Sequence, residues 1–562
     1  RSTKESLTLP NGKVLPIAHQ PELPVERFIV SDAPDAEAVP MDVVFVGGGP
    51  AGLAGAIELA RLVKKDDEAG GTLGDIQIAV LEKAASLGEH SLSGAVVNPI
   101  AMQELFPELD MKDFPFRSPV EKERVYLLAG QKHFRIPAPP TMWNHGNYIA
   151  SICEIVRWLG EKAEAEGVNI FTGFPAASLL VDGDKVQGVR TTPTGLARNG
   201  EPGSGYAPPT DITARVTVLS EGTRGSLSQA WMKSQKVTSE NPQIFALGVK
   251  EIWETKKPLD AIIHTLGWPV PLDAFGGSFM YPLSPNQVAV GLVVGMDYRG
   301  TGVDVHEMLQ QMKQHPLFKQ YLDGGEMVEW GAKTIPEGGY YAMPNQRAGN
   351  GVLLAGDAAG FVEVASLKGV HYAMRSGILA ARAIFTALKK NDTSAAGLAE
   401  YDRAIDSSYI VRDLRARRNM RLAFQKYGFF LGGAMASLMI ATKGLFPGWK
   451  IASHRDSEVP RNVEPAERFV PDGKLTFSKL DANFKSGNAT RDDAPSHLVV
   501  GQDIDGEVAD LYTHMCPAGV YERDGDRLIV NAANCIDCKA TDVIGPRWTP
   551  REGGAGPRYR LM

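Results

Sequence analysis

Three cysteines near the C-terminus are the residues most able to do chemistry, and their spacing is typical of a metal centre. Cys516, Cys535 and Cys538 lie close together, whereas the whole chain of 562 residues contains only 4 cysteines. The two-residue gap between Cys535 and Cys538 lets both thiolates reach one metal centre. Cys153 falls in an apolar helical pattern and is expected to be a core side chain. So few cysteines exclude a disulfide scaffold and favour a reducing compartment.

The cysteine pattern leaves the type of metal centre open. A three-iron cluster needs only three thiolates, whereas a four-iron cluster would take an oxygen ligand from Thr541, Asp542, Asp537 or solvent. A zinc ion would instead use His514 together with the three cysteines. The spacing favours iron–sulfur over zinc, and reduced thiols without any metal are a third interpretation.

A glycine-rich turn near the N-terminus has the form of a dinucleotide-binding fingerprint. Gly47, Gly49 and Gly52 follow an apolar segment and precede a helical pattern, which is the strand–turn–helix context that the motif requires. Such glycines permit a tight turn, admit a pyrophosphate and let the helix pack against the strand. A second apolar segment, 76–81, ends at Glu82, whose carboxylate is expected to accept hydrogen bonds from ribose hydroxyls.

A second glycine-rich unit favours FAD over NAD. The short apolar segment 351–355 runs into Gly356, Asp357 and Gly360, and a further helix follows. The unit resembles the second FAD motif of flavoproteins with two dinucleotide-binding elements, in which the Asp accepts from the ribityl chain. Taken alone, Asp357 would be interpreted as an ordinary helix N-cap. Paired with the first motif, it indicates FAD.

A basic segment followed by an uncharged one predicts contact with a membrane surface. Residues 427–442 carry no charge and are too few to cross a bilayer, but they are enough to lie in its interface. Trp449 suits the interfacial belt. A buried core helix is the alternative for this segment. The basic residues just before it would favour anionic headgroups; they are Arg412, Arg415, Arg417, Arg418, Arg421 and Lys426.

Composition and charge limit the class of protein. Hydrophobic residues make up 43% and charged residues 22% of the chain, which fits an ordered globular protein of about three domains. The formal net charge is -7, which argues against a nucleic-acid partner because such proteins usually carry a basic excess.

Longer stretches resemble the electron transfer flavoprotein–ubiquinone oxidoreductase family. The resemblance runs from about Val43 to the end and consists of many independent stretches in one order. They include GEHSLSGA (88–95), NHGNYI (144–149), HTLGWP (264–269), GGSFMY (276–281), GFVEV (360–364), LKG (367–369), CPAGVYE (516–522) and EGGAGP (552–557).

The resemblance implies a mixed α/β (α+β) fold. A FAD domain of the two-dinucleotide-binding type is interleaved with a quinone-binding β-sheet domain, and a C-terminal ferredoxin-like iron–sulfur domain follows. We expect an irregular N-terminal arm at 1–40, the FAD domain at 41–190 and 330–425, the quinone-binding domain at 191–330, an interfacial membrane segment at 427–450 and the iron–sulfur domain at 460–562.

The resemblance also implies the reaction. Single electrons would pass from reduced electron transfer flavoprotein through a [4Fe-4S] cluster and FAD to ubiquinone. The location would be the matrix face of the mitochondrial inner membrane or the cytoplasmic face of a bacterial one. The cofactors would carry out this chemistry, so no side chain is expected to act as a catalytic group.

Further site residues are implied by the resemblance alone. In the family pattern position 541 is the fourth cysteine ligand, but this chain has Thr541 there. A three-iron cluster, or a four-iron cluster with one ligand other than cysteine, is therefore expected. Family members often have Tyr where Phe275 stands, which removes a hydroxyl but leaves backbone contacts possible. The implied FAD contacts are Lys83, Ser93, Gly94 and Gly369, and the implied quinone contacts are Phe275, Gly276 and Gly277.

Three rival functions remain at this stage. A flavin-dependent prenyl reductase of the geranylgeranyl type would share the FAD motifs but normally lacks the long ferredoxin-like tail. A quinone oxidoreductase could take its electrons from a different donor. A non-catalytic FAD protein with a zinc-bound tail would act as a docking module.

Overall fold

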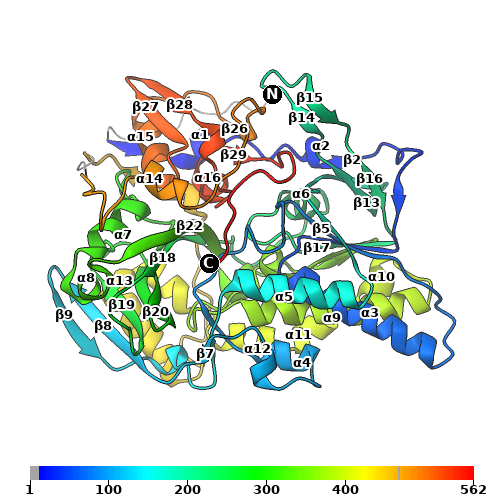
Figure 1. Ribbon diagram of the computed structural model, residues 1–562, viewed down its shortest axis with the longest axis horizontal. Helices are drawn as coiled ribbons and strands as arrows, with labels where there is room; N and C mark the ends of the chain where they lie inside the picture. The colour runs from blue at the N-terminus through cyan, green and yellow to red at the C-terminus, as the bar shows by residue number, and fades with distance from the viewer. Residues whose placement is uncertain (1–11, 466–468) are drawn as a thin grey trace.

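Two large β-sheets organise the computed structural model, which describes residues 12–465 and 469–562. The first sheet lies to the right of centre at about mid-height in Figure 1, and the second lies on the left. In strand order, the first sheet contains β11 (Asn169–Thr172), β5 (Ile78–Glu82), β4 (Val43–Val46), β17 (Val216–Leu219), β24 (Val352–Leu354) and β23 (Ala348–Gly349).

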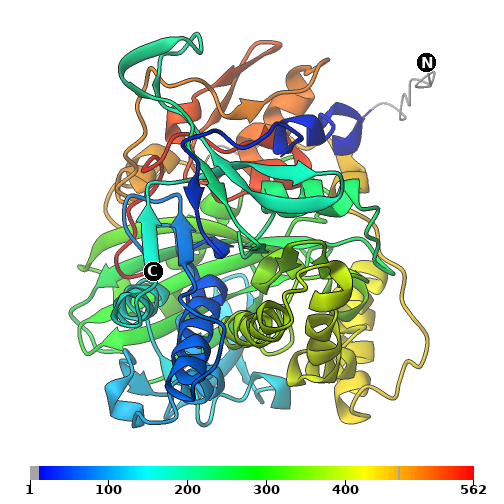
Figure 2. The ribbon, with the colours of Figure 1, turned by 90° about the vertical axis from the view of Figure 1, so that its right-hand side faces the viewer.

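The six-stranded sheet has the architecture expected for a dinucleotide-binding domain. Strands β11, β5, β4, β17 and β24 are parallel, and only β23 is antiparallel. The strands are short apolar runs with buried side chains, as parallel strands covered on both faces require. Helices α3 (Pro50–Glu68), α5 (Ile152–Ala165) and α9 (Val370–Lys389) lie side by side below the sheet (Figure 2).

Helices α3 and α9 pack unusually closely because glycines meet at their crossing. A Cβ atom on Gly377 of α9 would lie 2.0 Å from the carbonyl oxygen of Ala51 in the first turn of α3. A Cβ atom on Gly55 of α3, at the same crossing, would lie 2.9 Å from the carbonyl oxygen of Gly377. Neither position has room for a side chain, so the start of α3 is held rigidly over the sheet.

The seven-stranded sheet is antiparallel except where β19 pairs parallel with β8. Helices α7 (Val305–Lys313) and α8 (Pro316–Leu322) cover it and share its apolar core. The strand order is β22 (Glu326–Pro336), β18 (Phe245–Glu254), β21 (Gln287–Gly295), β20 (Gly276–Ser284), β19 (Ile262–Gly267), β8 (Glu123–Ala129) and β9 (Lys132–Ile136).

A C-terminal unit of short helices and hairpins lies on top of the sheets, coloured orange to red in Figure 1. Its apolar side chains belong to the same core cluster as the seven-stranded sheet, so the two parts are packed together rather than linked loosely. The elements of the unit are α14 (Lys479–Phe484), β26 (Leu498–Val499), α15 (Gly506–Met515), β27 (Tyr521–Asp524), β28 (Arg527–Val530), α16 (Ala540–Ile544) and β29 (Arg547–Trp548).

The last residues leave this unit and run back into the nucleotide-binding part. Tyr559 is buried against Gly331 of β22, and Met562 is fully buried. Ser151, at the start of α5, donates from Oγ to the carbonyl oxygen of Met562 over 3.0 Å. Glu329 of β22 accepts from two backbone N–H groups of the tail. The tail therefore links the C-terminal unit to both large sheet domains.

Strand pairing differs from the expected domain division at two places. Strand β17 falls within the expected quinone-binding range of 191–330, yet it pairs with β4 and β24 in the six-stranded sheet. Strands β8 and β9 fall within 41–190 but extend the seven-stranded sheet. The reason is that a strand belongs to the sheet whose neighbours complete its hydrogen bonds, whatever its position in the sequence.

The described part of the expected irregular arm, residues 12–40, contains short elements that join the rest of the fold; residues 1–11 lie outside the described residues. Its Phe28 is buried in the main core, which explains why the segment is held in place. Two of its strands form the edges of a five-stranded sheet. The order of that sheet is β2 (Ile29–Val30), β12 (Ala176–Asp182), β13 (Lys185–Thr191), β16 (Asp211–Thr213) and β3 (Val39–Pro40).

The segment expected at the membrane forms helix α13 (Met420–Ala441), which is kinked at Gly428, where φ is 73°. Its outer face exposes Phe430, Leu431 and Leu438, and the loop after it exposes Leu445 and Trp449. Among the described residues, no helix has both the length and the apolar character needed to cross a bilayer.

Candidate functional site

The first glycine-rich turn joins β4 to α3. Gly47 has a φ of 115°, and a Cβ on it would lie 2.3 Å from the carbonyl oxygen of Ser220. A Cβ on Gly52 would lie 2.1 Å from the carbonyl oxygen of Gly47. Gly49 caps α3 without any side-chain hydrogen bond, and its Cβ position faces open space. The helix therefore presents free N–H groups to a space in which a pyrophosphate fits.

Glu82, at the end of β5, lies beside this turn. Its two carboxylate oxygens accept from the backbone N–H groups of Gly48 (3.1 Å) and Ala84 (2.8 Å). Each oxygen keeps a further lone pair, so the group can also accept from a ribose hydroxyl. The Nζ of Lys83, predicted as a FAD contact, lies 2.7 Å from Oδ2 of Asp537 in the cysteine-rich loop.

The second motif lies next to the first. Gly356 and Asp357 begin a short 3-10 helix after β24. This helix ends at Gly360, which has the left-handed conformation with a φ of 76°. A Cβ on Gly356 would lie only 3.1 Å from the Cβ of Ala51 in α3. Burial raises the pKa of Asp357 to about 6, although the positive charge of Lys333 opposes this shift. The structure thus brings both motifs to the carboxyl edge of the sheet, where such folds bind ligands.

The other predicted FAD contacts lie on loops around this edge. Gly369 is the N-cap of α9 and has no side-chain cap of its own. The carbonyl oxygen of Ser93 accepts from Nζ of Lys250 over 3.0 Å. Burial lowers the pKa of Lys250 to about 8. Gly94 lines a cavity that reaches toward the seven-stranded sheet.

This cavity brings together side chains to which the sequence analysis gave no role. Nε2 of His264 on β19 lies 2.6 Å from the hydroxyl of Tyr281 on β20. Burial lowers the pKa of His264 to about 3, so its ring is neutral at physiological pH. Burial also lowers the pKa of Lys368 to about 8. The residues that line the cavity are Gly94, Val96, Met142, Asn144, His264, Tyr281, Ser366, Leu367 and Lys368.

The predicted quinone contacts lie at the start of β20, outside the lining of that cavity. A Cβ on Gly276 would lie 2.4 Å from backbone of β21, and one on Gly277 would lie 2.5 Å from backbone of β19. Both glycines are therefore required by strand packing as well as by any ligand. The ring of Phe275 lies against Phe424 of α13 and under the guanidinium group of Arg421, 4.6 Å from its ring centre.

Arg421 differs from the expectation that it faces lipid headgroups. It is buried and pairs with Asp297 (2.7 Å) and Glu337 (2.6 Å). A buried guanidinium with two carboxylate partners has no need of an external anion. Of the basic residues before the apolar segment, Arg412, Arg415 and Lys426 are the exposed ones.

The three C-terminal cysteines are buried and line one cavity. Burial raises the pKa of each thiol, that of Cys535 to about 12, so the thiolate forms are favoured only with a metal bound. Among the described residues, no carboxylate and no imidazole line this cavity, and His514 lies outside the lining. This soft ligand set fits iron and sulfide better than a zinc site completed by His514. The lining residues are Leu498, Cys516, Ala518, Val520, Tyr521, Cys535, Ile536, Cys538, Lys539, Ala540 and Thr541.

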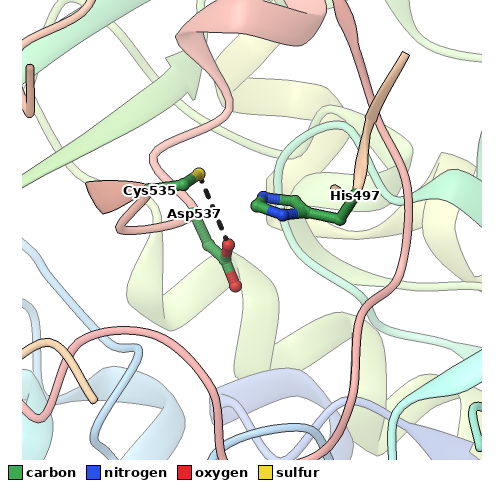
Figure 3. Close-up of side chains that lie close together, drawn as sticks. All are labelled: His497, Cys535 and Asp537. Atoms are coloured by element: carbon green, nitrogen blue, oxygen red, sulfur yellow. Dashed lines mark hydrogen bonds between the residues drawn. The ribbon is translucent and has the colours of Figure 1, made fainter. Parts of the chain in front are cut away.

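His497, Cys535 and Asp537 form a second group, whose potential ligand atoms lie within 4.8 Å of one another (Figure 3). The carboxylate of Asp537 is already fully engaged, because it accepts from Arg551 (2.8 Å), Trp548 (2.9 Å) and Lys83 (2.7 Å). Burial alone would raise the pKa of Asp537, but the charges of Arg551 and Lys83 hold it well below its ordinary value. The group is therefore an ion-pair cluster beside the cysteines.

Lys333 of β22 lies between the two cofactor sites and was missed by the sequence analysis. Its Nζ donates to the carbonyl oxygen of Asp537 over 3.3 Å, and its charge also acts on Asp357 and Cys538. Burial lowers the pKa of Lys333 to about 8. The sequence of β22 also contains Glu326, Glu329 and Thr334, so a lysine in this strand gave no distinct signal. Its neighbour Thr334 donates from both its N–H and its hydroxyl to the carbonyl oxygen of Cys538, each over 2.9 Å.

Two family models match this chain. The ubiquinone-binding model of ETF-QO matches residues 245–335, which cover the seven-stranded sheet from β18 to β22. The 4Fe-4S model of electron transfer flavoprotein-ubiquinone oxidoreductase matches residues 473–560, which hold the three cysteines.

Full-length relatives carry the same name. The mitochondrial electron transfer flavoprotein-ubiquinone oxidoreductase of Oryza sativa subsp. japonica is 37% identical over 553 residues, covering 94% of each chain. The probable bacterial enzyme of Acinetobacter baylyi is 34% identical over 579 residues, covering 94% of this chain and 99% of that one.

Two solved structures resemble about three quarters of this chain in fold. A geranylgeranyl bacteriochlorophyll reductase-like protein from Thermoplasma acidophilum has a TM-score of 0.56 and 17% identity. It covers 72% of this chain and is itself covered over 96% of its length. A flavin-dependent brominase has a TM-score of 0.50 and 18% identity. The match covers 74% of this chain and 96% of the brominase chain. These matches support a FAD-type fold and nothing more specific.

Proposed function

The chain belongs to the electron transfer flavoprotein-ubiquinone oxidoreductase family, and from that premise we propose that it passes single electrons from reduced electron transfer flavoprotein through an iron–sulfur cluster and FAD to ubiquinone. The chain is an oxidoreductase with FAD and iron–sulfur cofactors. The order of the relay, the protein donor and the membrane surface are our proposal.

The observation that carries the proposal is the direct link between the two cofactor sites. Lys83 follows Glu82 at the nucleotide turn, and its Nζ lies 2.7 Å from Asp537, which stands between Cys535 and Cys538. Strand β22 of the quinone-type sheet joins the same point through hydrogen bonds from Lys333 and Thr334. The cysteine loop is therefore joined directly to the end of β5 beside the nucleotide turn and to the sheet that the ubiquinone-binding model matches.

Each part of the chain has a defined task in this scheme. Gly47, Gly49 and Gly52 would admit the pyrophosphate of FAD, and Asp357 would accept from the ribityl chain. Cys516, Cys535 and Cys538 would bind the cluster. When bound, the cluster supplies one-electron transfer, and the flavin supplies both one- and two-electron chemistry.

The quinone would contact the region between the flavin edge and α13. Gly276 and Gly277, which pair with β21, are partly exposed there, and Phe275 packs against α13 beside them. The cavity next to Gly94 adds the hydrogen-bonded pair of His264 and Tyr281. Reduction of a quinone consumes protons, and these polar groups would orient the ring oxygens and exclude bulk water.

Helix α13 would lie on the membrane surface that holds the quinone. The part of the helix after the kink exposes large apolar side chains, with Phe430 74% exposed, and Leu445 in the next loop is 82% exposed. An apolar face flanked by exposed Arg412, Arg415 and Lys426 suits an anionic lipid surface. We place it on the matrix face of the mitochondrial inner membrane or the cytoplasmic face of a bacterial inner membrane, with segment 427–450 as the contact.

The test separates the donor reaction from the quinone reaction. Purified holoprotein is mixed anaerobically with enzymatically reduced electron transfer flavoprotein and a short-chain ubiquinone, and reoxidation of the donor is followed by its absorbance. The Cys538→Ser variant should lose at least tenfold in donor-dependent quinone reduction but keep its bound FAD. The matched control, Cys153→Ser, changes a buried cysteine outside the cluster cavity and should keep the rate.

Other outcomes would favour the rivals. Quinone reduction that does not depend on the flavoprotein donor would indicate a different electron source. Reduction of a geranylgeranyl chain would indicate a prenyl reductase, and zinc in place of iron would indicate a docking module.

A further inference from the structure

The cluster cavity has one position at which a thiolate is missing. Thr541 lies in the first turn of α16, three residues after Cys538, and its side chain lines the same cavity as the three cysteines. It is buried, with 7% of its surface exposed. The residue is thus placed where a fourth ligand would stand, and its hydroxyl is the group that the chain offers there.

The carboxylates suggested by the sequence do not serve as this ligand. Both oxygens of Asp537 are held by Lys83, Arg551 and Trp548. Asp542 accepts from Arg224 (2.8 Å) through one oxygen and from the backbone N–H of Trp548 (3.2 Å) through the other. Neither aspartate is among the residues that line the cavity. Release of either carboxylate would leave buried cations unpaired, which is costly.

The hydroxyl of Thr541 is itself engaged. Its Oγ1 donates to the carbonyl oxygen of Pro546 over 3.0 Å and lies 2.6 Å from the hydroxyl of Tyr521, from which it accepts. A hydroxyl in this arrangement is neutral and has at most one free lone pair. Iron–sulfur sites select thiolates, so a neutral hydroxyl is a far weaker ligand than the three cysteines.

We infer that Thr541 leaves one iron position of the cluster exchangeable, whereas the three cysteines hold the other three irons firmly. The inference rests on the cluster of the proposed function and deepens it. The same protein would then exist in a four-iron and a three-iron form, and the supply of ferrous iron would determine which one is populated.

The interconversion balances in atoms and electrons. A one-electron oxidant such as ferricyanide takes one electron from a [4Fe-4S]2+ core and gives [4Fe-4S]3+. Loss of one Fe2+ then leaves [3Fe-4S]+ with all four sulfides retained. Return requires one Fe2+ and one electron, which dithionite supplies.

The experiment uses the holoprotein purified without oxygen. Bound iron and acid-labile sulfide are measured before and after stoichiometric ferricyanide and removal of free iron, and low-temperature EPR is recorded on each sample. The wild-type protein should lose about one iron in four, keep its sulfide and gain the EPR signal of an oxidised three-iron cluster. Ferrous iron with dithionite should reverse the change.

Two variants make the test specific to position 541. Thr541→Cys supplies the missing thiolate and should keep all its iron through the same treatment. Thr541→Ser keeps the hydroxyl with minimal change of volume and should behave as the wild type. Both replacements are close in size to threonine, so each can be compared at equal FAD content.

The outcomes separate the two proposals. A wild-type protein that keeps four irons after oxidation, or a Thr541→Cys variant that loses iron as readily as the wild type, would overturn the inference and leave the relay intact. A protein that contains neither iron nor sulfide in any variant would overturn both the inference and the proposed function.

Discussion

At the scale of single residues, Asp537 joins the nucleotide turn to the cysteine loop. Its carboxylate is buried and is balanced by Lys83 and Arg551, with a third hydrogen bond from Trp548. A buried ion pair is costly to form, but removal of one partner is costlier, because it leaves an unpaired charge behind. Asp537 therefore fixes the loop between Cys535 and Cys538 rather than binding a metal.

Replacement of this carboxylate should weaken the ion pairs that connect the cysteine loop to the nucleotide-binding part. Asp537→Asn keeps the shape and one hydrogen bond but leaves Lys83 and Arg551 without a counter-charge, at a cost of about 3 kcal/mol. Thermal unfolding of the holoprotein, followed by the release of flavin fluorescence, should show a clearly lower midpoint. Asp526→Asn, on the exposed hairpin between β27 and β28, is the control and should leave the midpoint unchanged. Equal midpoints for the two variants would show that the ion pairs contribute no stability.

Sequence patterns could not reveal this role. The sequence offered Asp537 as an oxygen ligand because it lies between two cysteines, but its partner Lys83 is 454 positions away. By contrast, the glycine turn, Glu82 and the Gly356–Asp357 unit lie where their motifs predicted, because each motif is local and its backbone geometry follows from the glycines.

At the scale of elements, α13 shows what an apolar run can and cannot predict. The absence of charge from 427 to 442 predicted a segment that avoids water, and the structure has a kinked helix there. A run without charged residues has no strongly polar face, so its sequence pattern does not show which side of the helix is buried. Only the packed fold distinguishes the buried Met439 from the exposed Phe430 and Leu431.

Charges placed on the exposed face should detach the protein from lipid. The double variant Phe430→Glu, Leu431→Glu removes two apolar side chains, each worth roughly 1.5–3 kcal/mol when buried. Binding to vesicles with anionic headgroups, measured by co-sedimentation, should fall at least tenfold. The control is Phe484→Glu, which changes an equally exposed phenylalanine on α14 of the cysteine-containing unit and should leave binding unaffected. Loss of binding in this control alone would place the membrane contact on the cysteine-containing unit instead.

At the scale of the whole molecule, the parts are interleaved more thoroughly than the sequence divisions suggested. The six-stranded sheet takes strands from near residues 43, 216 and 352, and the seven-stranded sheet takes β8 and β9 from between them. The order of strands in a sheet depends on pairing over long distances, whereas composition and motifs report only on nearby residues. The existence of three parts was therefore predictable, but their exchange of strands was not.

The buried tail should be essential for stability although none of the residues 559–562 lines either of the two cavities described above. Tyr559→Ala removes a fully buried aromatic ring between β22 and the tail and should cost about 3 kcal/mol. The temperature at which bound flavin is released should fall accordingly. Arg558→Ala changes the exposed neighbour and should have little effect. An unchanged release temperature for Tyr559→Ala would mean that the tail is only loosely attached.

The position of the tail also bears on how the protein is made. Ribosomes add about 5–20 residues per second, so the segment that reaches Met562 emerges roughly half a minute or more after the first glycine turn. By then β4 has long had its neighbours β5 and β17, but the α5 end of the domain still lacks its final cover. Any stability that the tail adds to the flavin-binding and cysteine-containing parts is therefore gained only when residues 559–562 have been made.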